Sequence, residues 1–300
     1  MSETNDQQLI FDRAIVKARR RRFGRDAPGF LTDFAVEELT ERLAGINRTF
    51  DKICSLSAVP GLEAALRAGG SDGRLVTMDA SSDLAARHGG SGVVGDEEFL
   101  PFAPGSLSCV LSLLTLQLVN DLPGSLIQIR RALAPDGLFL GVLLGGASLN
   151  EVRQVFLQAE AELSGGASLR VAPFPDVREM GALLQRAGFA LPVVDSDKIT
   201  VRYGDFLSLL RDLRHLGWAN PLAQRPRTFL RRDVLMRAGA LYHQNHSDPD
   251  GRIRASFELV WITGWAPHES QQKPLRPGSA KTRLADALGT KEHSLDAGDE

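Results

Sequence analysis

Acidic side chains that follow predicted strands are the residues of this sequence best suited to hold a sugar. Asp79 ends the strand expected over Arg74 to Met78, where a carboxylate can accept hydrogen bonds from both hydroxyls of a ribose. Asp96 and Glu97 supply two more carboxylates shortly before Leu100. Ligands of open α/β sheets bind at the carboxyl ends of strands, so we expect these acids to face one site. The alternative for the last two is a plain acidic surface loop.

The turn after the strand expected over Phe50 to Leu56 is the second part of this site. Such turns favour glycine, because a residue without a Cβ atom lets the backbone approach a bound cofactor closely. Here the chain has Ser55, Ser57 and Val59, and only Gly61 is a glycine. A β-branched valine narrows the space for a ligand and does not readily adopt a positive φ. By itself the turn favours an ordinary strand-to-helix connection.

Polar residues after the next buried strand could line the side of the site that receives a substrate. Gln117, Asn120 and Asp121 follow the apolar run from Leu107 to Leu114. Asn120 and Asp121 also precede a helix that has Pro123 in its first turn, and both are good N-cap residues. A purely structural role as a helix cap is therefore the alternative for at least one of them.

A metal site is conceivable at the stretch HQNHSDPDG, which contains His243, His246, Asp248 and Asp250. Imidazoles and carboxylates are ligands of zinc. The stretch is polar and rich in turn residues, and its spacing is unspecific, so we expect a surface loop and no metal. The sequence contains neither a G-x-S-x-G elbow nor a phosphate-binding P-loop.

A dense basic cluster, Lys17 with Arg19 to Arg22, lies in the first expected helix, Leu9 to Arg22. A solvated helix face is the common use of such a cluster. Docking to an acidic partner or substrate is the functional alternative. We expect no nucleic-acid partner, because no aromatic residues interleave with these cations and no second basic patch accompanies them.

Alternating strands and helices must position these residues, and the stretch from Ser106 to Gly146 shows the pattern most clearly. Its two short apolar runs, Leu107 to Leu114 and Leu138 to Leu144, are typical of strands covered on both faces. Between them, apolar residues recur at helical spacing. Strand, helix and strand form one right-handed βαβ unit. We therefore predict a doubly wound, mostly parallel α/β sheet.

Local signals suggest further elements on either side of this unit. The stretch from Gly89 to Gly95 is expected to be flexible, and Leu191 to Val194 and Ile199 to Tyr203 are expected to form a pair of strands. The run from Ser148 to Glu151 matches a capping box, which begins a helix. Asp176 is expected to cap another helix.

The bulk composition describes an ordinary soluble protein. The chain has 300 residues, a hydrophobic content of 43% and a formal net charge of -2, which gives no general attraction to nucleic acid or anionic lipid. Cys54 and Cys109 lie in apolar runs and are expected to be buried free thiols. No apolar run approaches the roughly 20 residues of a membrane span, and no secretory signal begins the chain. We expect a cytoplasmic location.

Several motifs together resemble a known family. LQLVNDLP at 116–123 and IRRALAPDGLFLG at 129–141 resemble the fourth and fifth strands of class I S-adenosylmethionine-dependent methyltransferases. FDR at 11–13, LPF at 100–102 and GWAPHESQQKPLRPGSAKTRLADAL at 264–288 are similar to the branch of the mitochondrial complex I assembly factor 5 and its bacterial relatives. The resemblance covers nearly the whole chain and implies a Rossmann-like methyltransferase fold.

The resemblance also implies S-adenosylmethionine as the cofactor. The acid after the second strand would bind the ribose, and an acid or amide in the third loop would bond the adenine amino group. Where the family has D-x-G-x-G-x-G, this chain reads S-L-S-A-V-P-G, which replaces the acid and two glycines and should weaken cofactor binding. The residues that match the cofactor positions are Ser55, Ser57, Gly61, Asp79, Asp96 and Glu97.

Three functions follow from the resemblance. The first is a methyltransferase that acts in respiratory complex I assembly. Methyl transfer from a sulfonium requires no particular catalytic residue. The second is an arginine hydroxylase-type activity on a complex I subunit. The third is a non-catalytic assembly factor or chaperone with a degenerate cofactor loop. A complex I subunit or assembly intermediate is the expected protein partner.

The expected domain organisation has three parts. Residues 1–45 form an N-terminal helical extension. Residues 46–268 form the methyltransferase-like domain, with a helical insertion at about 205–242. Residues 269–300 form a polar tail that we expect to be disordered, because Pro, Lys, Ser and Gly dominate it.

Overall fold

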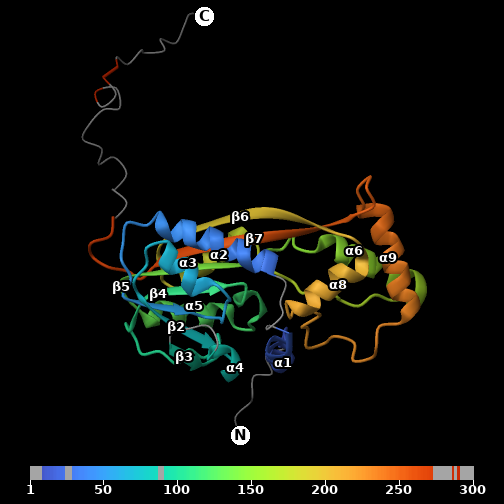
Figure 1. The fold of residues 1–300 in the computed structure, drawn as a ribbon, viewed down its shortest axis with the longest axis horizontal. Coiled ribbons are helices and arrows are strands. Elements are labelled where there is room, and N and C mark those ends of the chain that lie inside the picture. The colour runs from blue at the N-terminus through green and yellow to red at the C-terminus, as the bar shows by residue number, and fades with distance from the viewer. Residues whose placement is uncertain (1–8, 24–28, 87–90, 273–285, 287–288, 291–300) are drawn as a thin grey trace, which may run out of the picture. The chain divides into compact units, whose positions relative to one another are not determined.

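A computed structural model describes residues 9–23, 29–86, 91–272, 286 and 289–290 of the protein (Figure 1). Contacts divide the chain into two compact units, Met1–Pro267 and His268–Glu300. All the helices and strands that position the candidate site belong to the first unit. Most of the expected disordered tail lies outside the described residues. The three-part domain division stays a prediction.

One seven-stranded sheet forms the centre of the first unit (Figure 1). The strand order is β3-β2-β1-β4-β5-β7-β6. Strands β1 to β5 are parallel, and β7 runs antiparallel to both of its neighbours. The predicted doubly wound, mostly parallel sheet is therefore confirmed. The strands are β1 Lys52–Ser55, β2 Arg74–Asp79, β3 Ser91–Val94, β4 Leu107–Leu113, β5 Leu133–Leu144, β6 Ala190–Tyr203 and β7 Ile253–Trp265.

Helices cover both faces of the sheet. α2 and α3 pack over one face together with the cluster that contains Leu39 and Leu62, whereas α5 and α7 pack over the other with Leu126 and Met180. α6, α8 and α9 lie together beside the far ends of β6 and β7 (Figure 1). The helices are α1 Arg13–Phe23, α2 Gly29–Ala44, α3 Leu62–Ala68, α4 Ser82–Ala85, α5 Leu122–Ala132, α6 Asn150–Ser164, α7 Val177–Arg186, α8 Phe206–His215 and α9 Arg232–His246, with a short 3-10 helix, η1, at Leu116–Leu118.

The central βαβ unit forms as its sequence predicts. Leu126 and Ile129 have no exposed surface and place the buried face of α5 on the sheet. The helix ends at Ala132, and β5 begins at Leu133 rather than at the expected Leu138. The reason is that Leu133 pairs with Leu107 of β4, after which the register shifts.

Two strands differ from the expectation. The stretch expected to be flexible contains β3, because its backbone pairs in parallel with β2 from Val76 to Asp79. The expected pair of strands is one continuous strand, β6, because β7 pairs with it from Ala190 to Tyr203. Neither pairing can be read from the local sequence, since the partner strand lies elsewhere in the chain.

Of the two predicted helix caps, one is confirmed and the other is wrong. Asp176 caps α7 and forms a complete capping box with Glu179. The box predicted at Ser148 is wrong, since α6 begins at Asn150 and lacks a side-chain cap. The Ser148 hydroxyl instead exchanges hydrogen bonds with the backbone of Glu258 in β7, at 3.0 and 3.1 Å. A long-range partner has replaced the local one.

None of the helices in the described part of the chain is long and apolar enough to cross a membrane.

Candidate functional site

The carboxyl ends of β1, β2 and β4 meet where the strand order reverses, which is the usual ligand-binding place of such sheets. Asp79 is the last residue of β2, and only 1% of its surface is exposed. Its carboxylate accepts hydrogen bonds from the backbone N–H groups of Ala58, at 3.2 Å, and Ser81, at 3.0 Å. The acid predicted to hold a ribose is therefore fixed between the turn after β1 and the start of α4.

The turn after β1 folds around two serine hydroxyls that point into the protein. Ser55 donates a hydrogen bond to the carbonyl oxygen of Ser57 at 2.6 Å, and Ser57 donates to the carbonyl of Leu113 at 3.5 Å. Val59 packs into the hydrophobic core without a positive φ, so the backbone strain expected for a valine does not arise. Gly61 has φ 78° and precedes α3. It alone uses the conformational freedom of glycine in this turn.

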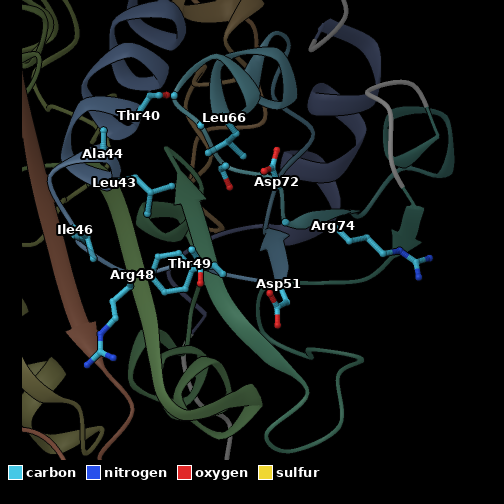
Figure 2. A pocket seen from close by; sticks show the side chains of 15 residues that line it. Thr40, Leu43, Ala44, Ile46, Arg48, Thr49, Asp51, Leu66, Asp72 and Arg74 are labelled. Carbon is cyan, nitrogen blue, oxygen red and sulfur yellow. The ribbon is translucent and has the colours of Figure 1, made fainter.

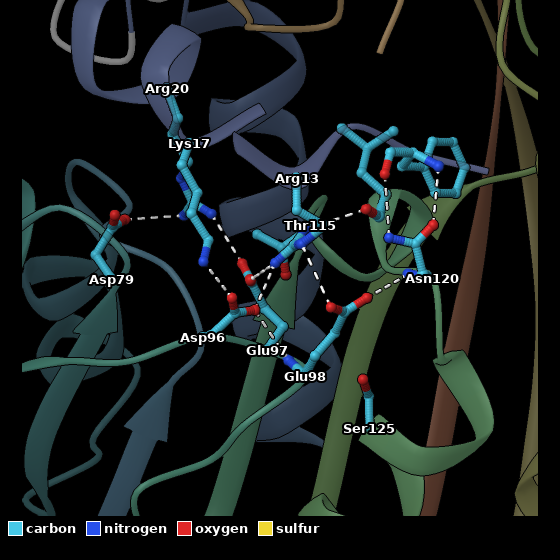
Figure 3. A network of polar contacts seen from close by, with 12 residues as sticks. Arg13, Lys17, Arg20, Asp79, Asp96, Glu97, Glu98, Thr115, Asn120 and Ser125 are labelled. Atoms are coloured by element: carbon cyan, nitrogen blue, oxygen red, sulfur yellow. Dashed lines mark hydrogen bonds and ion pairs between the residues drawn. The ribbon is translucent and has the colours of Figure 1, made fainter. Parts of the chain in front are cut away.

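Three cations of α1 cover the acidic loop that follows β3 (Figure 3). Arg13 Nη2 lies 2.7 Å from Asp96 Oδ1 and also pairs with Glu97. Lys17 pairs with the second oxygen of Asp96, and Arg20 Nη1 lies 3.0 Å from Glu97 Oε1. The acidic partner considered for the basic cluster is thus a loop of the same chain.

Arg20 also forms an ion pair with Asp79, the acid predicted to bind a ribose. Its Nη2 atom lies 3.0 Å from Asp79 Oδ2, so one guanidinium joins Glu97 to Asp79 (Figure 3). The Arg20 side chain is 23% exposed, whereas the Asp79 side chain is 1% exposed. A ligand that uses this carboxylate must compete with a cation that the fold already supplies.

These ion pairs favour the charged form of Asp96. Burial raises the pKa of Asp96, but hydrogen bonds from Lys17 and from the backbone of Glu98, with the charge of Arg13, outweigh it and lower the pKa from 3.8 to about 2. For Arg13, burial lowers the pKa, and the charges of Glu97 and Asp96 raise it above its ordinary value. Each group stabilises the ionised state of its partner.

The rest of the basic cluster has other surroundings. Arg19 donates hydrogen bonds to the backbone carbonyls of Ala219 and Asn220. Arg21 and Arg22 are exposed. The cluster is therefore divided between a solvated face, as first expected, and a face that binds the protein's own acids.

The three predicted substrate-side residues serve three different purposes. Gln117 lies on η1, is 3% exposed, and donates a hydrogen bond to the Leu114 carbonyl at 2.7 Å. Asn120 binds the backbone of Phe11, accepting from its N–H at 2.8 Å and donating to its carbonyl at 3.1 Å. Asp121 caps α5, so the capping alternative applies to Asp121 and not to Asn120.

Sequence reasoning did not assign Arg13 and Arg20 to this site. Both lie on the N-terminal helix, and their acidic partners are far downstream in the chain. The available signal was the coincidence of a basic row on one helix with an acidic loop in a chain of nearly neutral net charge.

A small cavity of about 120 Å³ lies between α1, the turn after β1 and η1. It is the space next to the candidate cofactor residues. Its wall includes Arg13, Arg20, Ser57, Val59, Glu97, Leu118 and Trp218.

A larger cavity of about 440 Å³ lies at the opposite, amino ends of β1 and β2 (Figure 2). Arg48, Asp51, Asp72 and Arg74 line it beside α2 and α3. None of the predicted site residues reaches it. Since ligands of parallel sheets bind at the carboxyl ends, we do not assign the site to this cavity.

The histidine-containing stretch does not bring a set of metal ligands together within the described residues. His243 and His246 lie on α9. Asp248 and Asp250 both pair with Arg202 of β6, at 2.8 and 2.6 Å.

Comparison with known proteins gives a consistent assignment. Residues 59–141 match the family model described as a methyltransferase domain. "Arginine-hydroxylase NDUFAF5, mitochondrial" from Homo sapiens is 34% identical over 280 residues, 90% of this chain and 81% of that protein. The protein of the same name from Danio rerio is 41% identical over 65% of this chain and 60% of its own length.

The chain belongs to the NDUFAF5 family. Malonyl-[acyl-carrier protein] O-methyltransferase from Laribacter hongkongensis is more distant, at 37% identity over 62% of this chain and 60% of that protein. The structure of a putative methyltransferase from Bacillus halodurans superposes with a TM-score of 0.51 at 14% identity, covering 78% of this chain and 99% of its own. It confirms the predicted Rossmann-like methyltransferase fold. The chain is therefore a methyltransferase-like member of the NDUFAF5 family.

The expected cytoplasmic location is wrong by this comparison. The human and zebrafish NDUFAF5 relatives are named as mitochondrial proteins, which points to the mitochondrion rather than the cytoplasm.

Proposed function

We propose that this NDUFAF5-family protein binds S-adenosylmethionine at the carboxyl ends of β1 and β2. The observation that supports this most is the position of Asp79, which ends β2 at the switch point and holds the N–H of Ala58 in the turn after β1. In this arrangement Asp79 accepts hydrogen bonds from the ribose hydroxyls. Asp96 or Glu97 accepts from the adenine amino group, and the turn from Ser55 to Gly61 lies along the ligand.

The residues present fit this ligand on condition that Arg20 leaves Asp79. The acid is in place, and Gly61 leaves open space beside the turn, since a Cβ atom built there would meet no atom within 4 Å. The bound ligand supplies a methyl group on a sulfonium. The protein's contribution is to orient that group towards an acceptor and to exclude water, and a base is needed only if the acceptor carries a proton.

A second candidate function is arginine hydroxylation on a protein, which is the activity in the names of the human and zebrafish relatives. Membership of their family favours it. The same resemblance supports a complex I subunit or assembly intermediate as the protein partner, in line with the mitochondrial setting of these relatives.

A third candidate is a non-catalytic assembly factor. The geometry that favours it is the closed state of the site, in which the Ser55 and Ser57 hydroxyls and both oxygens of Asp79 already have partners inside the protein.

Titration calorimetry with S-adenosylmethionine and S-adenosylhomocysteine tests the proposed cofactor binding and distinguishes it from the third candidate. We expect one-site binding near the micromolar range, about −8 kcal/mol. Asp79→Asn should weaken binding at least about tenfold, since a charge-assisted hydrogen bond contributes about 1.5–3 kcal/mol. The matched control is Asp72→Asn, an exposed acid at the amino side of β2, which should bind like the wild type. No heat with either ligand at millimolar concentration, or equal affinity in Asp79→Asn, would overturn the proposal.

A further inference from the structure

A third cavity, of about 180 Å³, lies among η1, α6 and α8. We propose that it binds the methyl acceptor and that this acceptor is an apolar chain ending in a carboxylate. The inference rests on the proposed function, because an acceptor site has a use only beside a methyl donor.

The cavity adjoins the candidate cofactor site directly. Leu118 and Trp218 line both this cavity and the smaller one beside the turn after β1. Leu118 is 7% exposed and holds the end of η1, where its carbonyl accepts a hydrogen bond from Arg13 at 3.1 Å. Two side chains thus separate the place expected for the donor from an apolar space on the other side.

Most of the cavity wall is aliphatic or aromatic. Its side chains come from the end of β5, from α6 and from α8, which are brought together by the packing of α6 and α8 against the sheet. Burial of an alkyl chain against such a wall is favourable, at about 25 cal/mol per Å² of apolar surface. The main apolar residues are Leu144, Val152, Phe156, Leu210, Leu213 and Trp218.

The polar groups of the wall are mostly engaged already. Arg170 is held by Glu160, which is 4% exposed, and this carboxylate also accepts the N–H of Ser168. Asn220 donates to the carbonyl of Leu169 at 2.8 Å. Two polar groups of the wall remain: the buried Oε1 atom of Gln117 has no hydrogen-bond partner, and the exposed Arg214 guanidinium forms no hydrogen bond or ion pair with any residue that the structure describes.

The surroundings of Arg214 favour an anion. Burial lowers the pKa of Arg19, and the positive charges of Arg225 and Arg214 lower it further. Asp12 is the acid that faces this group, and Arg225 Nη2 already binds it at 3.0 Å. Arg214 and Arg225 thus both act on Arg19, and an anionic head group beside Arg214 would add negative charge to this cationic region. A cationic acceptor, such as an amine, would be repelled.

The chemistry of the wall points to the same class of acceptor. The described residues that line the cavity include no Asp, Glu, His, Cys, Lys or Tyr, so no side chain there can take a proton from an acceptor. A carboxylate needs no such base, because it is already ionised at neutral pH. With the methyl donor bound, the carboxylate oxygen would attack the methyl carbon: a C–O bond would form, the S–CH₃ bond would break with its electron pair moving to sulfur, and a methyl ester and a thioether would result.

Binding of octanoate to the full-length protein tests the site without any turnover. We expect saturable binding by calorimetry, with octanol and octylamine at least about tenfold weaker, as the loss of a hydrogen bond to a charged group predicts. Arg214→Glu should weaken octanoate binding at least about tenfold. Arg211→Glu, on the same helix but outside the cavity wall, is the matched control and should leave it unchanged.

Filling the cavity gives a second, independent variant. Leu210→Trp should abolish octanoate binding, whereas Leu207→Trp, at a position that is 55% exposed on α8, should not. Equal binding of octanoate and octanol, or binding that survives both Arg214→Glu and Leu210→Trp, would overturn the proposal.

The two proposals fail in different ways. If S-adenosylmethionine does not bind but octanoate binds as predicted, the cavity is a carboxylate site and the methyltransferase function is wrong. If S-adenosylmethionine binds and octanoate does not, the cofactor site stands and the acceptor class is wrong. Formation of the methyl ester with both ligands present would support both proposals.

Discussion

Arg20 Nη2 lies 3.0 Å from Asp79 Oδ2, so a cation of the first helix occupies the carboxylate oxygen that a ribose would need. The same guanidinium holds Glu97 through Nη1. A ligand at the end of β2 therefore exchanges one charged partner of Asp79 for neutral hydroxyl groups. The strength of cofactor binding should therefore depend on the free energy needed to separate Arg20 from Asp79 and on the partner that Arg20 binds afterwards.

Removal of the competing cation should strengthen cofactor binding. In Arg20→Ala, Asp79 keeps its backbone hydrogen bonds but has no ion pair to lose. We expect S-adenosylmethionine to bind roughly three- to tenfold more tightly by calorimetry, since partly exposed ion pairs contribute about 1 kcal/mol. Arg22→Ala, an exposed arginine of the same helix, is the control. Weaker binding in Arg20→Ala would mean that the guanidinium contacts the ligand.

The ion pairs of Asp96 should make a stability contribution that disappears in acid. The pKa of Asp96 is about 2 in the folded protein, below its ordinary value of 3.8, so its contribution is fully present above pH 4 and is lost as the pH falls towards 2. The melting temperature of the wild type should exceed that of Asp96→Asn by a constant amount from pH 7 to about 4. Below that, the two curves should converge. A constant difference down to pH 2 would contradict this.

Neighbouring residues Asn120 and Asp121 should give separable effects. Asn120→Ala removes both hydrogen bonds to Phe11 and should increase hydrogen exchange of the N-terminal segment around Phe11, at a cost of about 1–3 kcal/mol for the two bonds. Asp121→Ala removes the N-cap of α5 and should lower global stability by about 1 kcal/mol without that local exchange. Identical exchange patterns in the two variants would refute the division of roles.

Both cysteines should be unreactive in the folded protein. Burial raises the pKa of Cys54 to about 12, and burial together with the charge of Cys54 raises that of Cys109 further. The thiolate is the reactive form, so an aromatic disulfide reagent at pH 8 should modify neither thiol until denaturant is added. Rapid reaction of one thiol in native conditions would show that β1 or β4 opens locally.

The parts of the fold that depend on short-range patterns could be predicted from the sequence. The βαβ unit was visible because Leu126 and Ile129 lie on one helix face between two apolar runs. The sequence also predicts that Asp79 ends a strand, because the residues directly before it are mostly apolar or β-branched. The role of these residues in ligand binding stays a prediction.

The parts that depend on distant partners could not be predicted. β3 has a short and weakly apolar sequence, and only its pairing with β2 makes it a strand. Ser148 has the sequence of a cap but binds Glu258, and Asn120 binds Phe11 rather than capping α5. In each case the polar atom has a local and a remote partner available, and the sequence shows only the local one.

The ion pairs of α1 have a consequence for how the protein is made. Arg13, Lys17 and Arg20 are synthesised well before Asp79, Asp96 and Glu97. A helix of α1's length with only Val16 buried is too short and too polar to be stable alone. On the ribosome it must wait as an unpaired cationic segment until β2 and the acidic loop have emerged. The cover of the candidate cofactor site is therefore synthesised before the acids that hold it and reaches its place only after them.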